Sequence, residues 1–503
     1  MKNKQSVIII GGGVGGLFCG AILSKEGYDV KVFEQHYKIG GGLHSFKREG
    51  VEFDTGMHEI GTFQPGGALN KICSYLGIMD KLSILPTDDD CFELFHIGSD
   101  RKIYRYAKGA ERFVETLAAE FPEEKENIKR YVQAMYDLVQ ETKMFNLEFN
   151  DYITTQHSPE FMMSVGDFIN SFTGNERLRA VLALTNPLYG GEQYKTPAHF
   201  HAIVNVLYIE SAARFVGSSQ QLADALIGVI RQSGGEVYAH NGVKHIEIKE
   251  KEIEYIVTAD GEKHRADWYI SSIHPSSLFK LMDTSKIQRS YWQRIDSIPN
   301  SYSSFTVYII FKPGTFPYLN YTGYYIDDYS QVWELGGYSP DDFPNGMMYL
   351  TPPETMNDKY AQKMIVNCIM GFDAVKKWEN TTTGKRGEEY ETFKRHCEEQ
   401  TINKLEKIYP DIRACIQSVY SASPLTIRDF YNQKEGALYG VKKDCNNMML
   451  SHIAVRTKLK NLLLTGQNLN LHGMVGTPIT AINTCAELLG MEYLLNQINQ
   501  SAN

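Results

Sequence analysis

The chain has 503 residues, of which 43% are hydrophobic and 22% charged, the composition of a globular protein long enough for two domains. Its net charge of −9 gives no reason to expect a nucleic acid as partner. The eight cysteines form no C-x-x-C pair, which excludes the common zinc-ligand spacing and the redox pair of a disulfide reductase. We therefore expect a reduced, cytoplasmic protein with no metal site.

The first element in chain order is a buried strand that leads into a glycine-rich turn. Residues 7–10 are an uninterrupted apolar run, as expected of a parallel strand covered on both faces. The turn has the spacing G-x-G-x-x-G and opens a helix that runs to about residue 27. Such glycines let the backbone approach a pyrophosphate, whose charge the helix N-terminus stabilises. The residues expected to bind the dinucleotide here are Gly11, Gly13, Val14, Gly15 and Gly16.

A second strand, over residues 28–33, ends at an acid. Glu34 follows Gly11 by about 20 residues, where an acidic side chain accepts a hydrogen bond from a ribose 2′-hydroxyl and repels an NADP-type phosphate. A second glycine cluster, residues 40–42, comes just after it. A glycine pair at this point resembles FAD enzymes of the glutathione-reductase type. We therefore expect FAD, with Gln35, Gly41, Gly42 and Leu43 also at its site.

The remaining chain divides into segments of two kinds. Residues 1–70, 213–275 and 455–495 have the pattern of one discontinuous FAD-binding domain, and residues 71–212 and 276–454 are expected to form a substrate-binding domain. The charge-free stretch at the N-terminus contains phosphate-binding glycines, so we expect no signal peptide and no transmembrane helix. Any contact with the inner face of the membrane is then peripheral.

The elements expected within these segments follow from their apolar periodicity and their Gly and Pro boundaries. Helices are predicted over 111–120, 124–144, 221–233 and about 480–494, and strands over 237–238, 243–248, 253–257, 304–311, 364–370 and 462–464. No second G-x-G-x-x-G opens a βαβ unit. Reduced NAD(P)H acting as a diffusible electron donor therefore has to bind at or near the flavin.

Several motifs together resemble one superfamily. They are D-T-G-M-H at 54–58, R-F-V-G at 214–217 and L-L-L-T-G-Q-N-L-N-L-H-G-M-V-G at 462–476. Over essentially the whole chain the sequence resembles the phytoene desaturase, carotenoid isomerase and retinol saturase superfamily of FAD enzymes, with motifs most similar to the retinol saturase branch. The resemblance implies an α/β fold, in which an α+β substrate domain is inserted into a glutathione-reductase-type Rossmann domain, as in amine oxidases and phytoene desaturases.

The resemblance also implies where the cofactor binds. A helix N-terminus in the C-terminal motif would stabilise negative charge on a reduced flavin. His58 and His472 are candidates to orient substrate or relay a proton, with hydrogen-bonded structural histidines as the alternative. The further cofactor residues implied are Asp54, Gly56, Val243, Gly466, Gln467, Gly476 and Thr477.

The function implied is hydride transfer from flavin N5 to a carbon–carbon double bond of a retinoid-like or carotenoid-like polyene, or of another lipophilic conjugated substrate. An apolar tunnel would bind this small-molecule partner. The sequence leaves open a carotenoid-type desaturase or a cis–trans isomerase on the same fold. A flavin amine oxidase and a non-catalytic isoprenoid-binding flavoprotein are the remaining alternatives. The sequence does not specify the oligomeric state.

Overall fold

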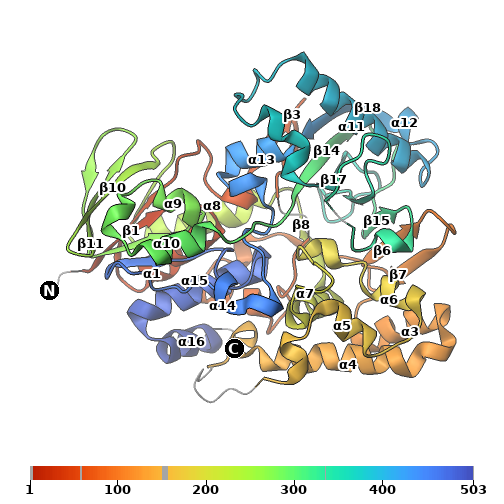
Figure 1. Ribbon diagram of the computed structural model, residues 1–503, viewed down its shortest axis with the longest axis horizontal. Helices are drawn as coiled ribbons and strands as arrows, with labels where there is room; N and C mark the ends of the chain where they lie inside the picture. The colour runs from red at the N-terminus through yellow and green to blue at the C-terminus, as the bar shows by residue number, and fades with distance from the viewer. Residues whose placement is uncertain (1–3, 57–58, 150–156, 335, 502–503) are drawn as a thin grey trace.

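A five-stranded parallel sheet carries the glycine-rich turn (Figure 1). The computed structural model describes residues 4–56, 59–149, 157–334 and 336–501. The sheet has the order β19-β13-β1-β2-β9 and joins segments that lie far apart in the sequence. Its strands are β1 (Ser6–Ile10), β2 (Asp29–Phe33), β9 (Glu236–Tyr238), β13 (Trp268–Ser271) and β19 (Leu462–Leu464).

Both faces of this sheet are covered, which explains the continuous apolar run in β1. Val7 and Ile9 pack in one core with α1 (Val14–Lys25), α8 (Gln220–Gln232) and α15 (Gly473–Leu489). Ile8 and Ile10 pack in another core with a three-stranded sheet on the opposite face. That sheet consists of β10 (Val243–Lys249), β11 (Glu252–Thr258) and β12 (Lys263–His264). Alternate residues of β1 therefore face opposite layers.

A mixed seven-stranded sheet forms the second large layer, in the order β18-β14-β17-β16-β15-β6-β7. The pair β6–β15 is parallel, and the other neighbouring strands are antiparallel. The strands are β6 (Glu93–Ile97), β7 (Ile103–Tyr106), β14 (Ser303–Phe311), β15 (Thr322–Ile326), β16 (Gly346–Leu350), β17 (Lys363–Met370) and β18 (Ile416–Ala422). The remaining strands are short. They are β5 (Ile84–Pro86), β8 (Ala213–Phe215) and the hairpin of β3 (Ser45–Arg48) and β4 (Val51–Asp54).

Alternation in this sheet separates a helix-facing side from a cavity-facing side. Phe305 and Val307 of β14 and Val366 of β17 pack in a core with α11 (Glu388–Glu406). Thr306 follows Phe305 and Asn367 follows Val366, and these two polar residues are register partners that line a cavity on the other side. The alternation of side chains along the two strands therefore places one polar side chain from each strand at the same part of the cavity lining.

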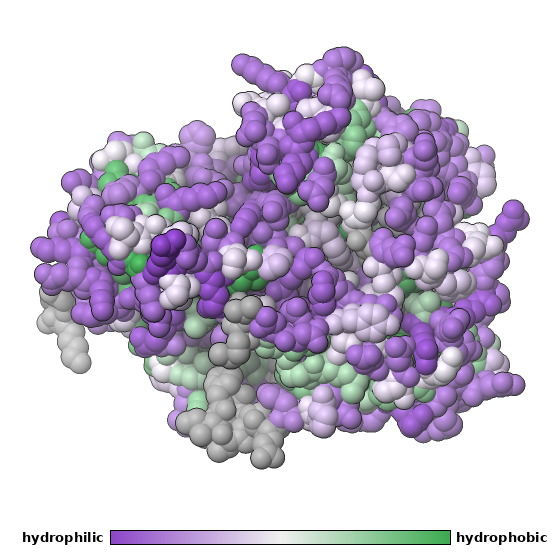
Figure 2. Space-filling model, in the orientation of Figure 1, coloured by the Kyte–Doolittle hydropathy of each residue, from purple (hydrophilic) through white to green (hydrophobic). Residues whose placement is uncertain are grey.

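The remaining helices form separate groups in Figure 1. One group, below the seven-stranded sheet in this view, contains α3 (Ala110–Glu120), α4 (Lys125–Glu141), α5 (Val165–Asn170), α6 (Glu176–Leu182) and α7 (Ala198–Ser211). The others are α2 (Ala68–Leu76), α9 (Pro275–Phe279), α10 (Arg289–Asp296), α12 (Ile412–Cys415), α13 (Pro424–Tyr431), α14 (Met448–Ser451) and α16 (Met491–Gln500). On the face shown in Figure 2, hydrophilic residues predominate and apolar residues form small separate groups.

The C-terminal helix was predicted with the wrong limits. Instead of one helix over about 480–494, α15 begins at Gly473 and ends at Leu489, and α16 begins at Met491. The break is at Gly490, whose φ of +89° is incompatible with a continuing helix. The start was placed too late because G-M-V-G-T-P resembles a loop, whereas α15 includes this segment and has Pro478 inside the helix.

Candidate functional site

A cavity of about 410 Å³ lies between the parallel sheet and the seven-stranded sheet. It is bordered by the turn after β1, the second glycine cluster, the end of β2, β10 and the start of α15. Fourteen residues that the sequence nominated line it: Gly11, Gly13, Val14, Gly15, Glu34, Gln35, Gly41, Gly42, Gly56, Val243, Gly466, Gln467, His472 and Thr477. Chain segments more than 460 positions apart in sequence thus meet here.

Close backbone contacts build a glycine cradle at one end of this cavity, formed by residues 11–16, 41–42 and 466. A Cβ atom added to Gly15 would lie 3.0 Å from the Cα of Gly466, and one added to Gly41 would lie 2.9 Å from the Cα of Gly13. Gly13 itself has room, since an added Cβ would meet no protein atom closer than 4.0 Å. The open side of Gly13 therefore faces space that a ligand can fill.

Backbone donors and one acid complete the cradle. Helix α1 begins at Val14 with no side-chain cap and no acid in its first turn, so its N-terminal amides and dipole are available to an anion. Glu34 accepts hydrogen bonds from the backbone N–H groups of Gly12, at 2.7 Å, and His36, at 2.8 Å. Each carboxylate oxygen keeps a second lone pair toward the cavity, which suits a ribose hydroxyl.

Four nominated residues do not line the cavity: Gly16, Leu43, Asp54 and Gly476. Gly16 permits close packing of α1, because an added Cβ would lie 2.1 Å from the carbonyl oxygen of Gly11. Gly476 does the same against Leu471, where the distance would be 2.3 Å. The contributions of these two glycines are to backbone packing beside the cavity.

Asp54 connects two loops behind the cradle. Its Oδ1 accepts hydrogen bonds from the Ser219 backbone N–H at 3.0 Å and from the hydroxyls of Ser218 and Ser219, both at 2.9 Å. Burial raises the pKa of Asp54 to about 6, and these serine donors oppose the shift. The Ser219 hydroxyl also donates to the carbonyl oxygen of Leu43 at 3.3 Å, so the second glycine cluster is tied to α8.

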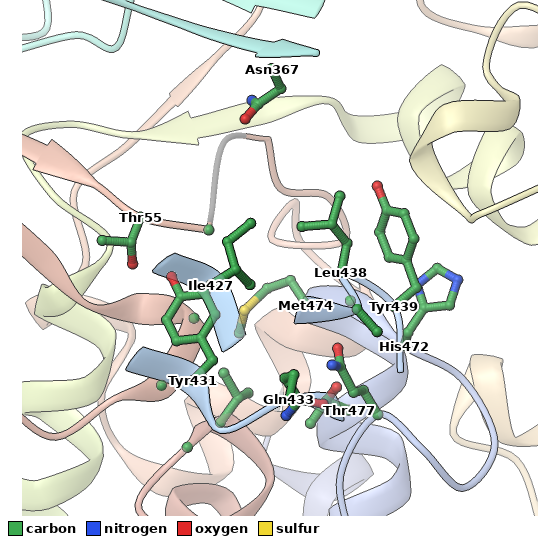
Figure 3. Close-up of a pocket in the computed structure, with 18 of the residues that line it drawn as sticks. Thr55, Asn367, Ile427, Tyr431, Gln433, Leu438, Tyr439, His472, Met474 and Thr477 are labelled. Atoms are coloured by element: carbon green, nitrogen blue, oxygen red, sulfur yellow. The ribbon is translucent and has the colours of Figure 1, made fainter. Parts of the chain in front are cut away.

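Beyond the cradle, the cavity lining combines apolar side chains with buried polar atoms (Figure 3). Ile427, Leu438 and Met474 lie between Asn367 on one side and Gln433 and Thr477 on the other. Several buried polar atoms of the lining have no hydrogen-bond partner among the described residues: His44 Nε2, Asn367 Nδ2, Tyr431 Oη, Gln433 Oε1 and His472 Nε2. Since buried polar groups are normally paired, these atoms fit a polar ligand in the cavity.

Sequence reasoning missed Asn367, Tyr431 and Gln433. Asn367 carried a usable signal, because it is the one strongly polar side chain in the apolar run M-I-V-N-C-I-M of β17. Thr306 donates a hydrogen bond to its Oδ1 at 2.9 Å and thereby orients the amide. The other two lie in and after the short helix α13, where no periodicity singles them out.

The two histidines nominated for catalysis have different outcomes. His58 lies outside the described residues. His472 lines the cavity, and its ring centroid lies 4.7 Å from that of Tyr439. Burial lowers the pKa of His472 to about 4, which favours a neutral imidazole near pH 7. A catalytic role for either residue stays a prediction.

Comparison with known proteins agrees with this geometry. A protein-family profile described as an NAD(P)-binding Rossmann-like domain matches residues 9–76. All-trans-retinol 13,14-reductase of Homo sapiens is 26% identical, over 95% of this chain and 84% of its own. A chloroplastic prolycopene isomerase of an Oncidium hybrid cultivar is 23% identical, over 87% of this chain and 75% of its own. These relatives confirm the superfamily resemblance and support an enzyme of the oxidoreductase type.

The fold is shared with solved structures. An oxidoreductase from Methanosarcina mazei aligns with a TM-score of 0.64 and 16% identity, covering 95% of this chain and 99% of its own. Together with the sheet topology, this likeness confirms the predicted α/β class. Among the residues that the structure describes, no helix has both the length and the apolar character needed to cross a bilayer.

Proposed function

Starting from its relationship to the retinol saturase branch of the phytoene desaturase and carotenoid isomerase superfamily, we propose that this protein is an FAD-dependent oxidoreductase. It reduces a carbon–carbon double bond of a retinoid-like or carotenoid-like polyene, or of another lipophilic conjugated substrate. The observation that carries the proposal is that one cavity joins the glycine cradle to a largely apolar compartment beneath the seven-stranded sheet.

The residues present fit a flavin dinucleotide. The open side of Gly13 and the uncapped N-terminus of α1 suit the pyrophosphate, and Glu34 suits the ribose. Helix α15 also begins without a side-chain cap or an acid in its first turn, beside Gln467 and Thr477 in the lining. Its N-terminal dipole would stabilise negative charge on the ring system.

The bound flavin would supply the hydride, and the chain would supply position and environment. Ile427, Leu438 and Met474 exclude water from the centre of the cavity. Asn367 Nδ2 provides one fixed hydrogen-bond donor among apolar side chains, enough to set the register of a polyene that carries one polar end. NAD(P)H would serve as the diffusible electron donor, bound at the same face.

A cis–trans isomerase is the second candidate, and the relative named prolycopene isomerase favours it. It would use the same cavity, but the flavin would end each cycle in the state in which it began. Product mass separates the two candidates, because reduction adds two hydrogens and isomerisation adds none.

Anaerobic mixing of the reduced flavoprotein with polyenes tests the proposed function. We expect all-trans-retinol, or another polyene of a panel that spans carotenoid and retinoid lengths, to reoxidise the flavin in a single turnover, seen as the return of its visible absorption. A flavin that stays reduced with every polyene, yet is reoxidised by an imine, would contradict the proposal and favour an amine oxidase.

Replacing Glu34 with alanine is expected to weaken FAD binding. The change removes a charged acceptor of a ribose hydrogen bond, worth about 2 kcal/mol, or about 30-fold in Kd. Titration of the apoprotein with FAD, followed by flavin fluorescence, measures the effect. Glu236→Ala is the matched control, because Glu236 lies on the adjacent strand β9, pairs with Lys31 at 2.9 Å and does not line the cavity. Equal affinities for the two variants would remove Glu34 from the site.

A further inference from the structure

A buried pair of carboxyl groups lies where the cavity meets the seven-stranded sheet. Glu59 follows the D-T-G-M-H motif, is only 8% exposed, and lines the cavity beside Thr322 and Tyr208. Its Oε2 accepts a hydrogen bond from the Thr322 hydroxyl at 3.0 Å. Its Oε1 is buried and has no hydrogen-bond partner in the part of the chain that the structure describes. One carboxyl oxygen of Glu59 is therefore hydrogen-bonded within the protein, and the other is available to a ligand.

A fixed positive charge lies behind this carboxyl. Arg214 is 2% exposed, and its Nη2 donates to the Thr322 hydroxyl oxygen at 2.9 Å, so that Thr322 connects the guanidinium to Glu59. Its Nη1 donates to the carbonyl oxygen of Leu319 at 3.0 Å. These bonds hold the guanidinium in place whichever protonation state Glu59 adopts. Arg214 itself does not line the cavity.

A second buried carboxyl group lies close to the first. Glu93 is fully buried on β6, directly opposite Thr322 in the register of β6 with β15. Its Oε1 accepts a hydrogen bond from the Tyr324 hydroxyl at 3.1 Å, and its Oε2 has no partner within the described ranges. Two neighbouring buried carboxyl groups cannot both carry a charge at small cost. The pair therefore retains a proton.

The groups that face Glu59 come from five elements: Glu93 on β6, Lys108 before α3, Tyr208 on α7, Arg214 on β8 and Tyr324 on β15. Burial raises the pKa of Glu59 to about 7, and the positive charges of Arg214 and Lys108 oppose the shift. Burial and the charge of Glu59 raise the pKa of Glu93 further. Glu59 lines the cavity and Glu93 does not, so Glu59 is the member of the pair that can pass a proton to a ligand.

We propose that Glu59 is the catalytic acid of the reaction, the residue that protonates the substrate carbon next to the one that receives hydride. This inference rests on the proposed function. A bound reduced flavin would supply the hydride, with both electrons, for the first C–H bond. The O–H bond of Glu59 breaks, its proton forms the second C–H bond, and the carboxylate remains beside Thr322 and Arg214. Water that enters after product release returns the proton.

The test compares Glu59→Gln with Glu26→Gln in single turnovers of the anaerobically reduced flavoprotein with a polyene that the wild type reduces. Glu26 accepts a hydrogen bond from Tyr75 at 2.6 Å and does not line the cavity. Glu26→Gln is therefore a control that makes the same change of side chain away from the cavity. We expect E59Q to reoxidise its flavin at least about 100-fold more slowly with unchanged FAD content, and E26Q to match the wild type. Equal rates for E59Q and the wild type would overturn the role of Glu59 alone.

Glu93→Gln tests whether Glu93 is the neutral member of the pair. Because Glu93 holds its proton while Glu59 ionises, glutamine keeps the same charge, and the pH above which turnover declines should be unchanged in E93Q. A move of that pH to lower values would show that Glu93 carries a negative charge beside Glu59.

A stability measurement reports on Glu59 without any turnover. A carboxyl with a raised pKa in the folded state keeps a proton that the unfolded chain releases, so wild-type stability falls from about pH 5 to about pH 8. The midpoint of thermal unfolding of E59Q should therefore rise relative to the wild type over this range, and a constant difference would contradict a protonated Glu59. Failure of the wild type to reduce any polyene would instead overturn the proposed function, and the proton-donor role with it.

Discussion

Alanine at position 13 is expected to prevent stable FAD binding and to leave the fold intact. The φ of Gly13 is −77°, which any residue adopts, and an added Cβ meets no protein atom closer than 4.0 Å. The methyl group instead enters the space assigned to the pyrophosphate, next to the N-terminus of α1. We expect FAD to bind about 100-fold more weakly, a loss of about 2.7 kcal/mol, in a fluorescence titration of the apoprotein.

The control for Gly13→Ala is Gly228→Ala. Gly228 lies within α8, and an added Cβ there has no neighbour within 4 Å. Alanine at this helical position should keep FAD affinity and slightly raise the melting temperature. If G13A purifies with full flavin occupancy, the pyrophosphate does not lie against this turn.

Arg214→Met is expected to destabilise the protein by about 3 kcal/mol at pH 8 and by less at pH 5. The substitution leaves the Leu319 carbonyl and the Thr322 hydroxyl oxygen without their charged donor. It also removes the positive charge that lowers the pKa of Glu59. Ionising Glu59 in the folded protein then costs more free energy, so the loss of stability is larger at pH 8 than at pH 5. Denaturant unfolding at the two pH values measures the difference.

Two further variants separate the charge of Arg214 from its geometry. Arg214→Lys keeps the charge but not the planar fork, so it should be less stable than the wild type by an amount that changes little with pH. The double variant R214M/E59Q should cost less at pH 8 than the two single changes together, because the buried carboxylate is absent. Additive costs would show that Arg214 and Glu59 do not interact.

Local spacing in the sequence was sufficient to predict the turn and the helix start that form the glycine cradle. The strand, the glycine turn, the helix and Glu34 occupy about 30 consecutive residues, in which turn chemistry and strand length determine the geometry. The same spacing could not distinguish Gly13, which faces the cavity, from Gly16, which packs α1 against the turn. Nor could it reveal that Asp54 is held by serines of a segment more than 160 positions away.

The part of the site formed by the seven-stranded sheet depends on pairing between strands that are distant in sequence, which no local pattern reveals. Asn367 reaches the cavity through the register of β17 with β14, and Glu93 lies opposite Thr322 through the register of β6 with β15. Glu59 stood directly after a recognised motif, yet its significance needs the buried guanidinium of Arg214. Local spacing thus locates the glycine cradle more readily than the polar groups that distant strands bring to the cavity.

The mass of the product formed under anaerobic conditions tests the central claim most directly. The reduced flavoprotein is mixed with stoichiometric polyene in D₂O, and the product is analysed by mass spectrometry while the flavin spectrum is recorded. We predict the addition of two hydrogen atoms in step with flavin reoxidation, at least one of them deuterium, because the acid proton and the flavin N5–H both exchange with D₂O. A product of unchanged mass and altered double-bond geometry, formed while the flavin stays reduced, would contradict reduction and identify an isomerase.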